Sequence, residues 1–172
     1  MHRAFLLWAV LVWSGLASAQ SLPSHFLANC TDIVDGDTIE VQYGGQVLRV
    51  RLEGIDAPEL GQPFGEEARQ RLANLVSTKR VMVSGAHTAG YGHLVARVAV
   101  DTFETSQTLV REGLAWQYKE YSNDPELAAL EQAARADQKG LWSARSPMPP
   151  WEWRAKCHEP GACDSPIRVS LP

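Results

Sequence analysis

Short runs in which apolar and polar residues alternate follow residue 25 of the chain. In the clearest run Leu48, Val50 and Leu52 alternate with Arg49 and Arg51. A period of two predicts a β-strand that turns its aliphatic side chains toward a core. The two arginines then share the opposite face, so we expect Arg51 to project away from the interior.

Turn residues divide this region into several strands. Asp35-Gly36-Asp37 interrupts the first run, and Gly44-Gly45 has the length and composition of a two-residue hairpin turn. A loop over residues 87–93 joins two later runs. The predicted strands lie between residues 25 and 34 and at 38–43, 46–52, 81–84 and 94–100.

Helical spacing replaces the alternation at three places. Ala68, Leu72, Leu75 and Val76 lie on one face of a predicted helix over 66–77. The other two predicted helices cover 106–112, ending at Gly113, and a segment that opens at Asp124-Pro125-Glu126 and stops before Gly140. Five strands with a helix after the third predict an α+β, mainly β protein: a five-stranded Greek-key OB barrel with about three helices. A generic α+β domain fits the same order.

The N-terminal residues have the composition of a secretory leader. Arg3 precedes an apolar run over residues 4–12, and Ala17-Ser18-Ala19 follows it. The run is shorter than the roughly 20 residues of a membrane span. We therefore expect a signal peptide over 1–19, cleaved after Ala19, and export to the periplasm or beyond with no stable membrane association afterwards.

Charge and cysteine content narrow the possibilities further. Losing Arg3 with the leader changes the net charge from −4 to −5, whereas proteins that grip nucleic acid through many phosphates are usually basic. Any nucleic-acid contact should therefore be local or rely on a cation. Of Cys30, Cys157 and Cys163 two can pair in an oxidising compartment, and the sequence does not choose the pair. A zinc site at Cys157, His158 and Cys163 lacks an evident fourth ligand.

Three acidic residues fall at turns beside strand ends, where their carboxylates can converge. Asp37, Asp56 and Glu59 would suit a hard cation such as calcium, which prefers oxygen ligands. Alternatively, Asp35 and Asp37 only shape a turn. Arg51 lies near the same strand end, and its planar guanidinium suits a phosphate oxygen.

Two stretches of the chain strongly resemble the signature stretches of the staphylococcal nuclease (thermonuclease-like) family. They are Val34–Ile39, VDGDTI, and Arg51–Glu59, RLEGIDAPE. The resemblance extends from Ala28 to Trp153 and implies an OB-fold domain over 28–154, followed by a tail over 155–172. It also implies a monomeric, calcium-dependent nuclease that hydrolyses phosphodiester bonds of DNA or RNA, with single-stranded nucleic acid as the expected substrate.

The resemblance implies a role for each residue that matches the family pattern. Asp37 and Asp56 would ligate calcium together with the backbone carbonyl of Ala57. Glu59 would orient or deprotonate the attacking water, and Arg51 would bind the phosphate. These roles suit phosphoryl chemistry, which depends on an in-line nucleophile and preorganised positive charge.

The chain departs from the family pattern at residue 93. Members typically carry an arginine there, after Tyr-Gly, as a second catalytic cation, and this chain has His93. A cationic histidine could donate a hydrogen bond or proton, but histidine loses its charge near neutral pH. Tyr91, Tyr118 and Tyr121 resemble family aromatics near the nucleotide pocket, where bases could stack, although packing roles fit them equally well.

Two other functions fit parts of the sequence. One is a binding module of the same family that keeps a nucleic-acid groove but has lost turnover together with the arginine. Retention of Asp37, Asp56, Glu59 and Arg51 argues against it, because binding alone requires no water-positioning carboxylate. The other, an oligosaccharide-binding or structural calcium domain, rests only on analogy to OB folds.

Overall fold

A computed structural model describes residues 22–89 and 93–157 of the chain. The predicted signal peptide, the proposed tail beyond residue 157 and Tyr91 therefore lie outside the described residues. No helix within the described ranges is both long and apolar enough to cross a membrane.

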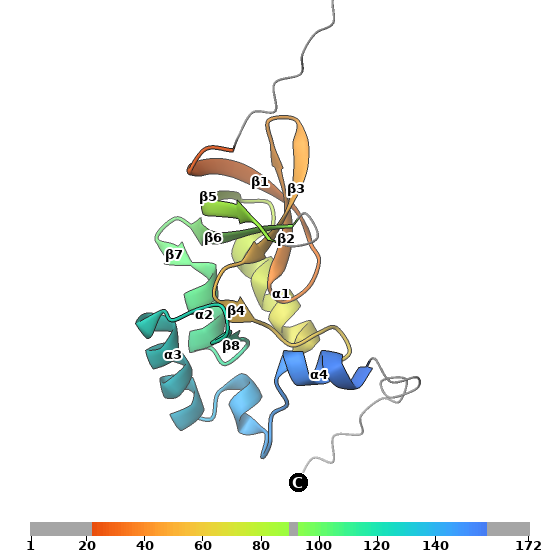
Figure 1. Ribbon diagram of the computed structural model, residues 1–172, viewed down its shortest axis with the longest axis vertical. Coiled ribbons are helices and arrows are strands. Elements are labelled where there is room, and N and C mark those ends of the chain that lie inside the picture. The colour runs from red at the N-terminus through yellow and green to blue at the C-terminus, as the bar shows by residue number, and fades with distance from the viewer. Residues whose placement is uncertain (1–21, 90–92, 158–172) are drawn as a thin grey trace, which may run out of the picture.

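Five strands form the closed barrel that the alternating pattern predicts (Figure 1). Neighbouring strands run antiparallel in the order β3-β2-β1-β5-β6, and a parallel pairing of β3 with β6 closes the ring. This confirms the predicted α+β fold with an OB-type barrel. The barrel strands are β1 (His25–Ile33), β2 (Thr38–Tyr43), β3 (Gln46–Leu52), β5 (Arg80–Thr88) and β6 (Leu94–Val100); β7 (Phe103–Glu104) extends the sheet at β6.

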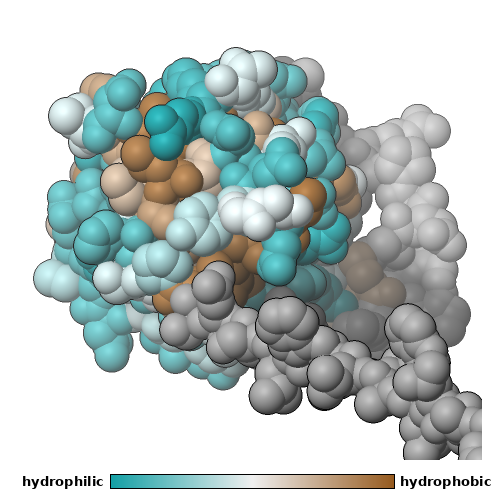
Figure 2. Space-filling view, turned by 90° about the horizontal axis from the view of Figure 1, so that it is seen from above, coloured by the Kyte–Doolittle hydropathy of each residue, from teal (hydrophilic) through white to brown (hydrophobic). Residues whose placement is uncertain are grey.

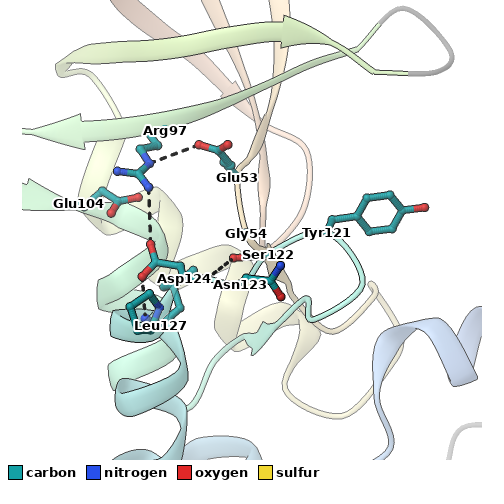
Figure 3. Close-up of a pocket in the computed structure, with 10 residues that line it drawn as sticks. Glu53, Gly54, Arg97, Glu104, Tyr121, Ser122, Asn123, Asp124 and Leu127 are labelled. Atoms are coloured by element: carbon teal, nitrogen blue, oxygen red, sulfur yellow. Dashed lines mark hydrogen bonds and ion pairs between the residues drawn. The ribbon is translucent and has the colours of Figure 1, made fainter.

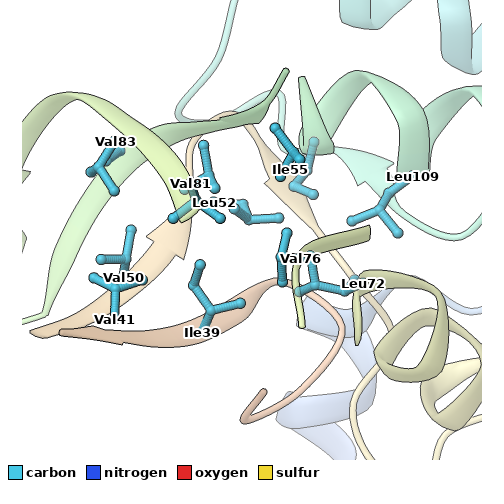
Figure 4. Close-up of a cluster of buried hydrophobic side chains, with 14 of the residues drawn as sticks. Ile39, Val41, Val50, Leu52, Ile55, Leu72, Val76, Val81, Val83 and Leu109 are labelled. Carbon is cyan, nitrogen blue, oxygen red and sulfur yellow. The ribbon is translucent and has the colours of Figure 1, made fainter. Parts of the chain in front are cut away.

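Aliphatic side chains from alternate strand positions fill the barrel (Figure 4). Val50 and Leu52 of β3 are at most 1% exposed, as the alternation predicts. Leu72 and Val76 of α1 and Leu109 of α2 close one end of this core. Burying such side chains stabilises the fold by about 1.5–3 kcal/mol each. The barrel is therefore a stable scaffold for the residues at its rim.

Within the described residues four α-helices lie at one end of the barrel, one more than the sequence predicts (Figure 1). The extra helix, α4, has only eight residues and begins at Pro150, so it is too short for helical periodicity to reveal it. The helices are α1 (Gly65–Val76), α2 (Thr105–Arg111), α3 (Pro125–Ala136) and α4 (Pro150–Cys157), with a 3-10 helix, η2 (Gly140–Ser143), between the last two. Asp124 caps α3 as expected, since its carboxylate accepts from the N–H groups of Glu126 and Leu127.

A small second sheet lies between the barrel and these helices. β4 (Ile55–Asp56) pairs with β8 (Trp116–Gln117), so that Asp56 lies opposite Trp116. Trp116 belongs to a second apolar cluster, with Ala134, Leu141 and Trp142, against which Trp151 of α4 packs. The chain thereby brings α4 close to Asp56, about 100 residues away in sequence.

The cysteines divide into one free and one bonded among the described residues. Cys30 is a free thiol, whereas Cys157 is disulfide-bonded. A bond from Cys30 of β1 to the C-terminal segment, one of the pairings that the sequence leaves open, is therefore excluded.

The surface carries no single dominant apolar face in the view down the barrel end. Figure 2 shows mostly hydrophilic side chains with apolar patches between them. Among the described residues the large, strongly exposed apolar side chains come from three strands and two loops; they are Leu27, Val47, Leu60, Phe103 and Tyr121.

Candidate active site

Five charged side chains meet where the barrel adjoins β4 and α4. Three carboxylates and two guanidiniums interact directly, and we call this group the ion cluster. Its members are Asp37, Arg51, Asp56, Glu59 and Arg154. Four of these five residues are ones that the sequence resemblance marks as functional.

Arg51 joins the two signature stretches of the chain. Its Nη1 lies 2.8 Å from Asp37 Oδ1 and its Nη2 lies 2.6 Å from Asp56 Oδ1. The guanidinium is on the outer face of β3, as the alternation predicts, and its side chain is 29% exposed, against 3% for Asp37 and 0% for Asp56. The carboxylates therefore lie beneath the arginine.

The turn after β1 holds Asp37 in place. Asp35 accepts a hydrogen bond from the Asp37 N–H at 3.0 Å, so Asp35 shapes the turn, as the sequence suggests. Asp37 Oδ2 in turn accepts from the Ala57 N–H at 2.8 Å. This bond ties the VDGDTI turn to the residue after β4. The carbonyl role expected for Ala57 stays a prediction.

Burial makes Asp37 an unusual carboxyl group. Desolvation, aided by the nearby charges of Asp35 and Asp56, raises the pKa of Asp37 to about 7, even though Arg51 acts in the opposite direction. When Asp37, Asp56 and Glu59 are all ionised, three carboxylates face two guanidiniums in the cluster, so negative charge is in excess. A bound cation would relieve that excess.

The donors of the cluster fit a hard cation. Two buried carboxylates from separate stretches converge on one guanidinium, and oxygen donors are the ligands that calcium takes. Within residues 22–89 and 93–157 no group of three His, Cys, Asp or Glu side chains is arranged to hold a metal. The expected ligand set, two carboxylates and a carbonyl, does not require such a group.

Glu59 is the accessible carboxylate of the cluster. Its side chain is 33% exposed, and its Oε1 accepts from Arg154 Nη1 at 2.6 Å. Its Oε2 has no hydrogen-bond partner among the described residues. Glu59 is positioned through its backbone, since its N–H donates to Gln62 Oε1 at 3.0 Å and Gln62 Nε2 donates to Met148 O at 2.7 Å.

Arg154 is the member of the cluster that the sequence analysis does not identify. Its Nη1 and Nη2 lie 3.1 and 2.8 Å from the two oxygens of Asp56, and hydrogen bonding to Asp56 raises the pKa of Arg154 above its usual value. The residue ends the PPWEWR segment at residues 149–154. Neither helical periodicity nor the two signature stretches mark this segment.

The structure places His93 beside β3 but outside the ion cluster. His93 is exposed and precedes Leu94, which pairs with Val50 of β3. Within the described residues its side chain makes no hydrogen bond or ion pair; its carbonyl accepts from the Ala89 N–H at 2.9 Å. Arg97, the basic residue of β6, is engaged elsewhere, with Glu53 and Asp124.

An aromatic row starts next to the cluster. Tyr118 stacks on Trp151 of α4, with ring centroids 5.6 Å apart, and Tyr121 lies 4.7 Å from Tyr118. Desolvation, followed by the charge of Asp56, raises the pKa of Tyr118. Tyr121 is 73% exposed. The base-stacking roles of these tyrosines stay predictions.

Two pockets flank this region without containing the cluster. One of about 390 Å³ is lined by Glu53, Arg97, Glu104 and Asp124, and Tyr121 extends away from its ion pairs (Figure 3). Burial raises the pKa of Glu104 there. The other, of about 330 Å³, lies along Trp116, Tyr118 and Trp151. Neither pocket is lined by a member of the ion cluster.

Several known proteins with similar sequences carry nuclease names. Residues 49–144 match the model of the family described as "Staphylococcal nuclease homologue". The chain is 42% identical over 123 residues to an "Uncharacterized endonuclease" of Escherichia coli O157:H7, covering 71% of this chain and 80% of that protein. It is 40% identical over 142 residues to a "Micrococcal nuclease" of Shigella flexneri, covering 76% and 82%. It is 39% identical over 165 residues to "Protein ParB" of Escherichia coli, covering 90% of each.

The matched segment includes the end of β3 from Arg49, β4 and the residues through Glu59, which together carry three of the five members of the ion cluster. The family resemblance drawn from the two signature stretches is thereby confirmed. The chain belongs to the staphylococcal nuclease family of phosphodiester-hydrolysing nucleases.

Proposed function

We propose that this protein is an exported, calcium-dependent nuclease that hydrolyses phosphodiester bonds of single-stranded DNA or RNA. One observation carries the proposal. Arg51, Asp37, Asp56 and Glu59, which come from separate stretches of the chain, meet in one ion cluster at the barrel rim. A metal ligand pair, a phosphate-binding cation and a candidate base are thus within reach of one phosphate.

Asp37, Asp56 and the carbonyl of Ala57 would hold the calcium ion. When bound, the ion supplies positive charge beside the scissile phosphate. Arg51 supports the same phosphate from the protein side, since its guanidinium is partly exposed above the buried carboxylates and has five donors, two of which bind Asp37 and Asp56. Fixed charges of this kind stabilise the charge that develops in the transition state.

Glu59 is the best placed general base. It is the most exposed of the three carboxylates, and its Oε2 is available to accept a proton from an attacking water. We also propose that His93 takes the place of the arginine that family members carry in the β5–β6 loop, and that Tyr118 and Tyr121 offer stacking surfaces to bases.

The proposal is tested by cleavage of labelled single-stranded DNA and RNA, with calcium or with a chelator. We expect cleavage only with calcium. Glu59→Gln should lower kcat by about 100-fold or more, because a general base contributes 10² to 10⁴, and should leave the melting temperature within a few degrees. The matched control is Glu66→Gln, which removes an exposed carboxylate paired with Arg69 on α1.

Two outcomes would contradict the proposal. Tight binding of nucleic acid without cleavage under any metal condition would favour a binding module of the same family. Equal turnover by Glu59→Gln and Glu66→Gln would show that Glu59 is not the general base. The nuclease function would then be judged from cleavage by the wild type alone.

A further inference from the structure

A second arginine reaches the ion cluster from the C-terminal helix. Arg51 Nη2 lies 2.6 Å from Asp56 Oδ1, and Arg154 Nη1 lies 3.1 Å from the same oxygen. The guanidiniums of β3 and α4 therefore converge on one atom. They are 29% and 37% exposed, whereas the Asp56 side chain between them is fully buried. An anion arriving from solvent meets the two guanidiniums before it meets the carboxylate.

Packing outside the cluster positions α4. One turn before Arg154, Trp151 stacks on Tyr118 and meets Trp116 edge to face, with centroids 5.7 Å apart. Just before the helix, the carbonyl of Met148 accepts from Gln62. The backbone that carries Arg154 is thus held by aromatic contacts and a hydrogen bond that do not involve its charge. This arrangement preorganises the guanidinium, which is what electrostatic catalysis requires.

We propose that Arg154 is a catalytic residue that binds the scissile phosphate together with Arg51 and supplies the second permanent cation of the site. The proposal rests on the proposed nuclease function. In the reaction the water oxygen forms a new P–O bond and the ester P–O bond breaks. Glu59 takes the proton of the water, and the leaving oxygen takes a proton from solvent or His93. During these steps Arg154 stabilises the charge that develops on the non-bridging oxygens. The exposed His93 makes no side-chain contact with the ion cluster among the described residues, whereas Arg154 is part of it and its guanidinium stays protonated.

The test compares Arg154→Gln, Arg154→Lys, His93→Ala and Lys156→Gln. Lys156 is the matched control because it is an exposed cation on the same helix. kcat and KM are measured for single-stranded DNA with calcium, and the Kd for the same DNA is measured with a chelator. We expect Arg154→Gln to lower kcat by about 100-fold or more, with a weaker Kd. Arg154→Lys should lie between this variant and wild type, because lysine keeps the charge but loses the planar fork. Lys156→Gln should match wild type.

Three results would overturn the proposal. Arg154→Gln could retain wild-type kcat, or show a higher kcat with tighter calcium binding, which would make the arginine a competitor of the metal. His93→Ala could lose turnover while Arg154→Gln keeps it, which would assign the second cation to the loop. If Arg154→Gln does not fold, Arg154→Lys and its kcat decide instead.

Failure of the nuclease function itself would be visible in the wild type. If wild type cleaves nothing with calcium, the DNA Kd with chelator still tests Arg154. Weaker binding by Arg154→Gln but not by Lys156→Gln would support its phosphate contact, and equal binding by both would refute it.

Discussion

At the scale of single residues, the site contains carboxylates in positions that are shielded from water. Asp37 is 2% exposed and Asp56 is fully buried, and only two arginines balance them and Glu59. Burying an ionised carboxylate is costly unless a cation is near. The raised pKa of Asp37 is a consequence of this desolvation. We therefore expect the site to weaken the metal-free fold.

Asp37 should make the stability of the metal-free protein depend on pH. The folded state keeps the Asp37 proton up to about pH 7, whereas the ordinary value is 3.8. Between these values the folded state binds more protons, so this contribution to the free energy of unfolding falls as the pH rises, by up to about 1.4 kcal/mol per pH unit. With chelator, Asp37→Asn should gain stability relative to wild type from pH 4 to 7.

Melting temperatures across that range, with Asp101→Asn as an exposed control, check this prediction. A constant difference between Asp37→Asn and wild type would contradict it. Adding calcium at pH 7 should raise the melting temperature of wild type and not of Asp37→Asn, because a ligand that binds only the native state stabilises it.

Most residues of the ion cluster can be predicted from sequence because they lie in two short stretches beside strand ends. Alternation alone places Arg51 on the outer face of β3, and turn chemistry places Asp37. Arg154 could not be predicted in this way. Its contact with Asp56 spans 98 residues and depends on Trp151 stacking on Tyr118, which no local pattern reports.

At the scale of elements, the VDGDTI turn fits closely against its neighbours. A Cβ on Gly36 would lie 2.8 Å from Ala57 Cβ and 2.8 Å from Ala68 Cβ. Each of these Cβ atoms is bonded directly to the backbone, that of Ala57 just after β4 and that of Ala68 in α1. Neither atom can therefore rotate out of the way. Gly36 thus allows Asp37 to approach the Ala57 N–H.

Gly36→Ala should displace this turn and lower turnover by about 100-fold, because a misplacement of about 1 Å can have that effect. The same variant should also show a smaller calcium-induced rise in melting temperature. Gly44→Ala is the control. Gly44 has a φ of 57° in the hairpin, and an added Cβ there meets nothing within 4 Å, so this variant should lose stability and keep the kcat of the folded enzyme. Equal kcat values for the two variants would show that the close fit does not matter.

Elements of six or more residues with clear periodicity are predictable, and short ones are not. The barrel strands and α1 to α3 fall near the predicted positions. β4 and β8 have two residues each, and their pairing comes from the way α3 and η2 pack. These short elements bring Asp56 beside Trp116 and α4, which is why the sequence predicts the barrel better than the far wall of the site.

At the scale of the whole molecule, an acidic protein holds a polyanion through few contacts. The ion cluster offers Arg51 and Arg154, and each phosphate contact contributes about −0.7 to the slope of log K against log salt for single strands. With chelator we expect a slope of about −1.4 for wild type, and about −0.7 for Arg154→Gln. Fluorescence anisotropy over a salt series measures both. A slope several times steeper would mean that basic residues outside the cluster dominate binding.

Two members of the ion cluster lie outside the middle segment of the chain. Residues 49–144, the segment shared with the family model, contain Arg51, Asp56 and Glu59 but neither Asp37 nor Arg154. Because β1, β2 and the start of β3 also lie before residue 49, that segment alone would form neither the closed barrel nor the complete ion cluster. Loss of α4 alone would be different, because it would leave every barrel strand in place and remove only Arg154 from the cluster.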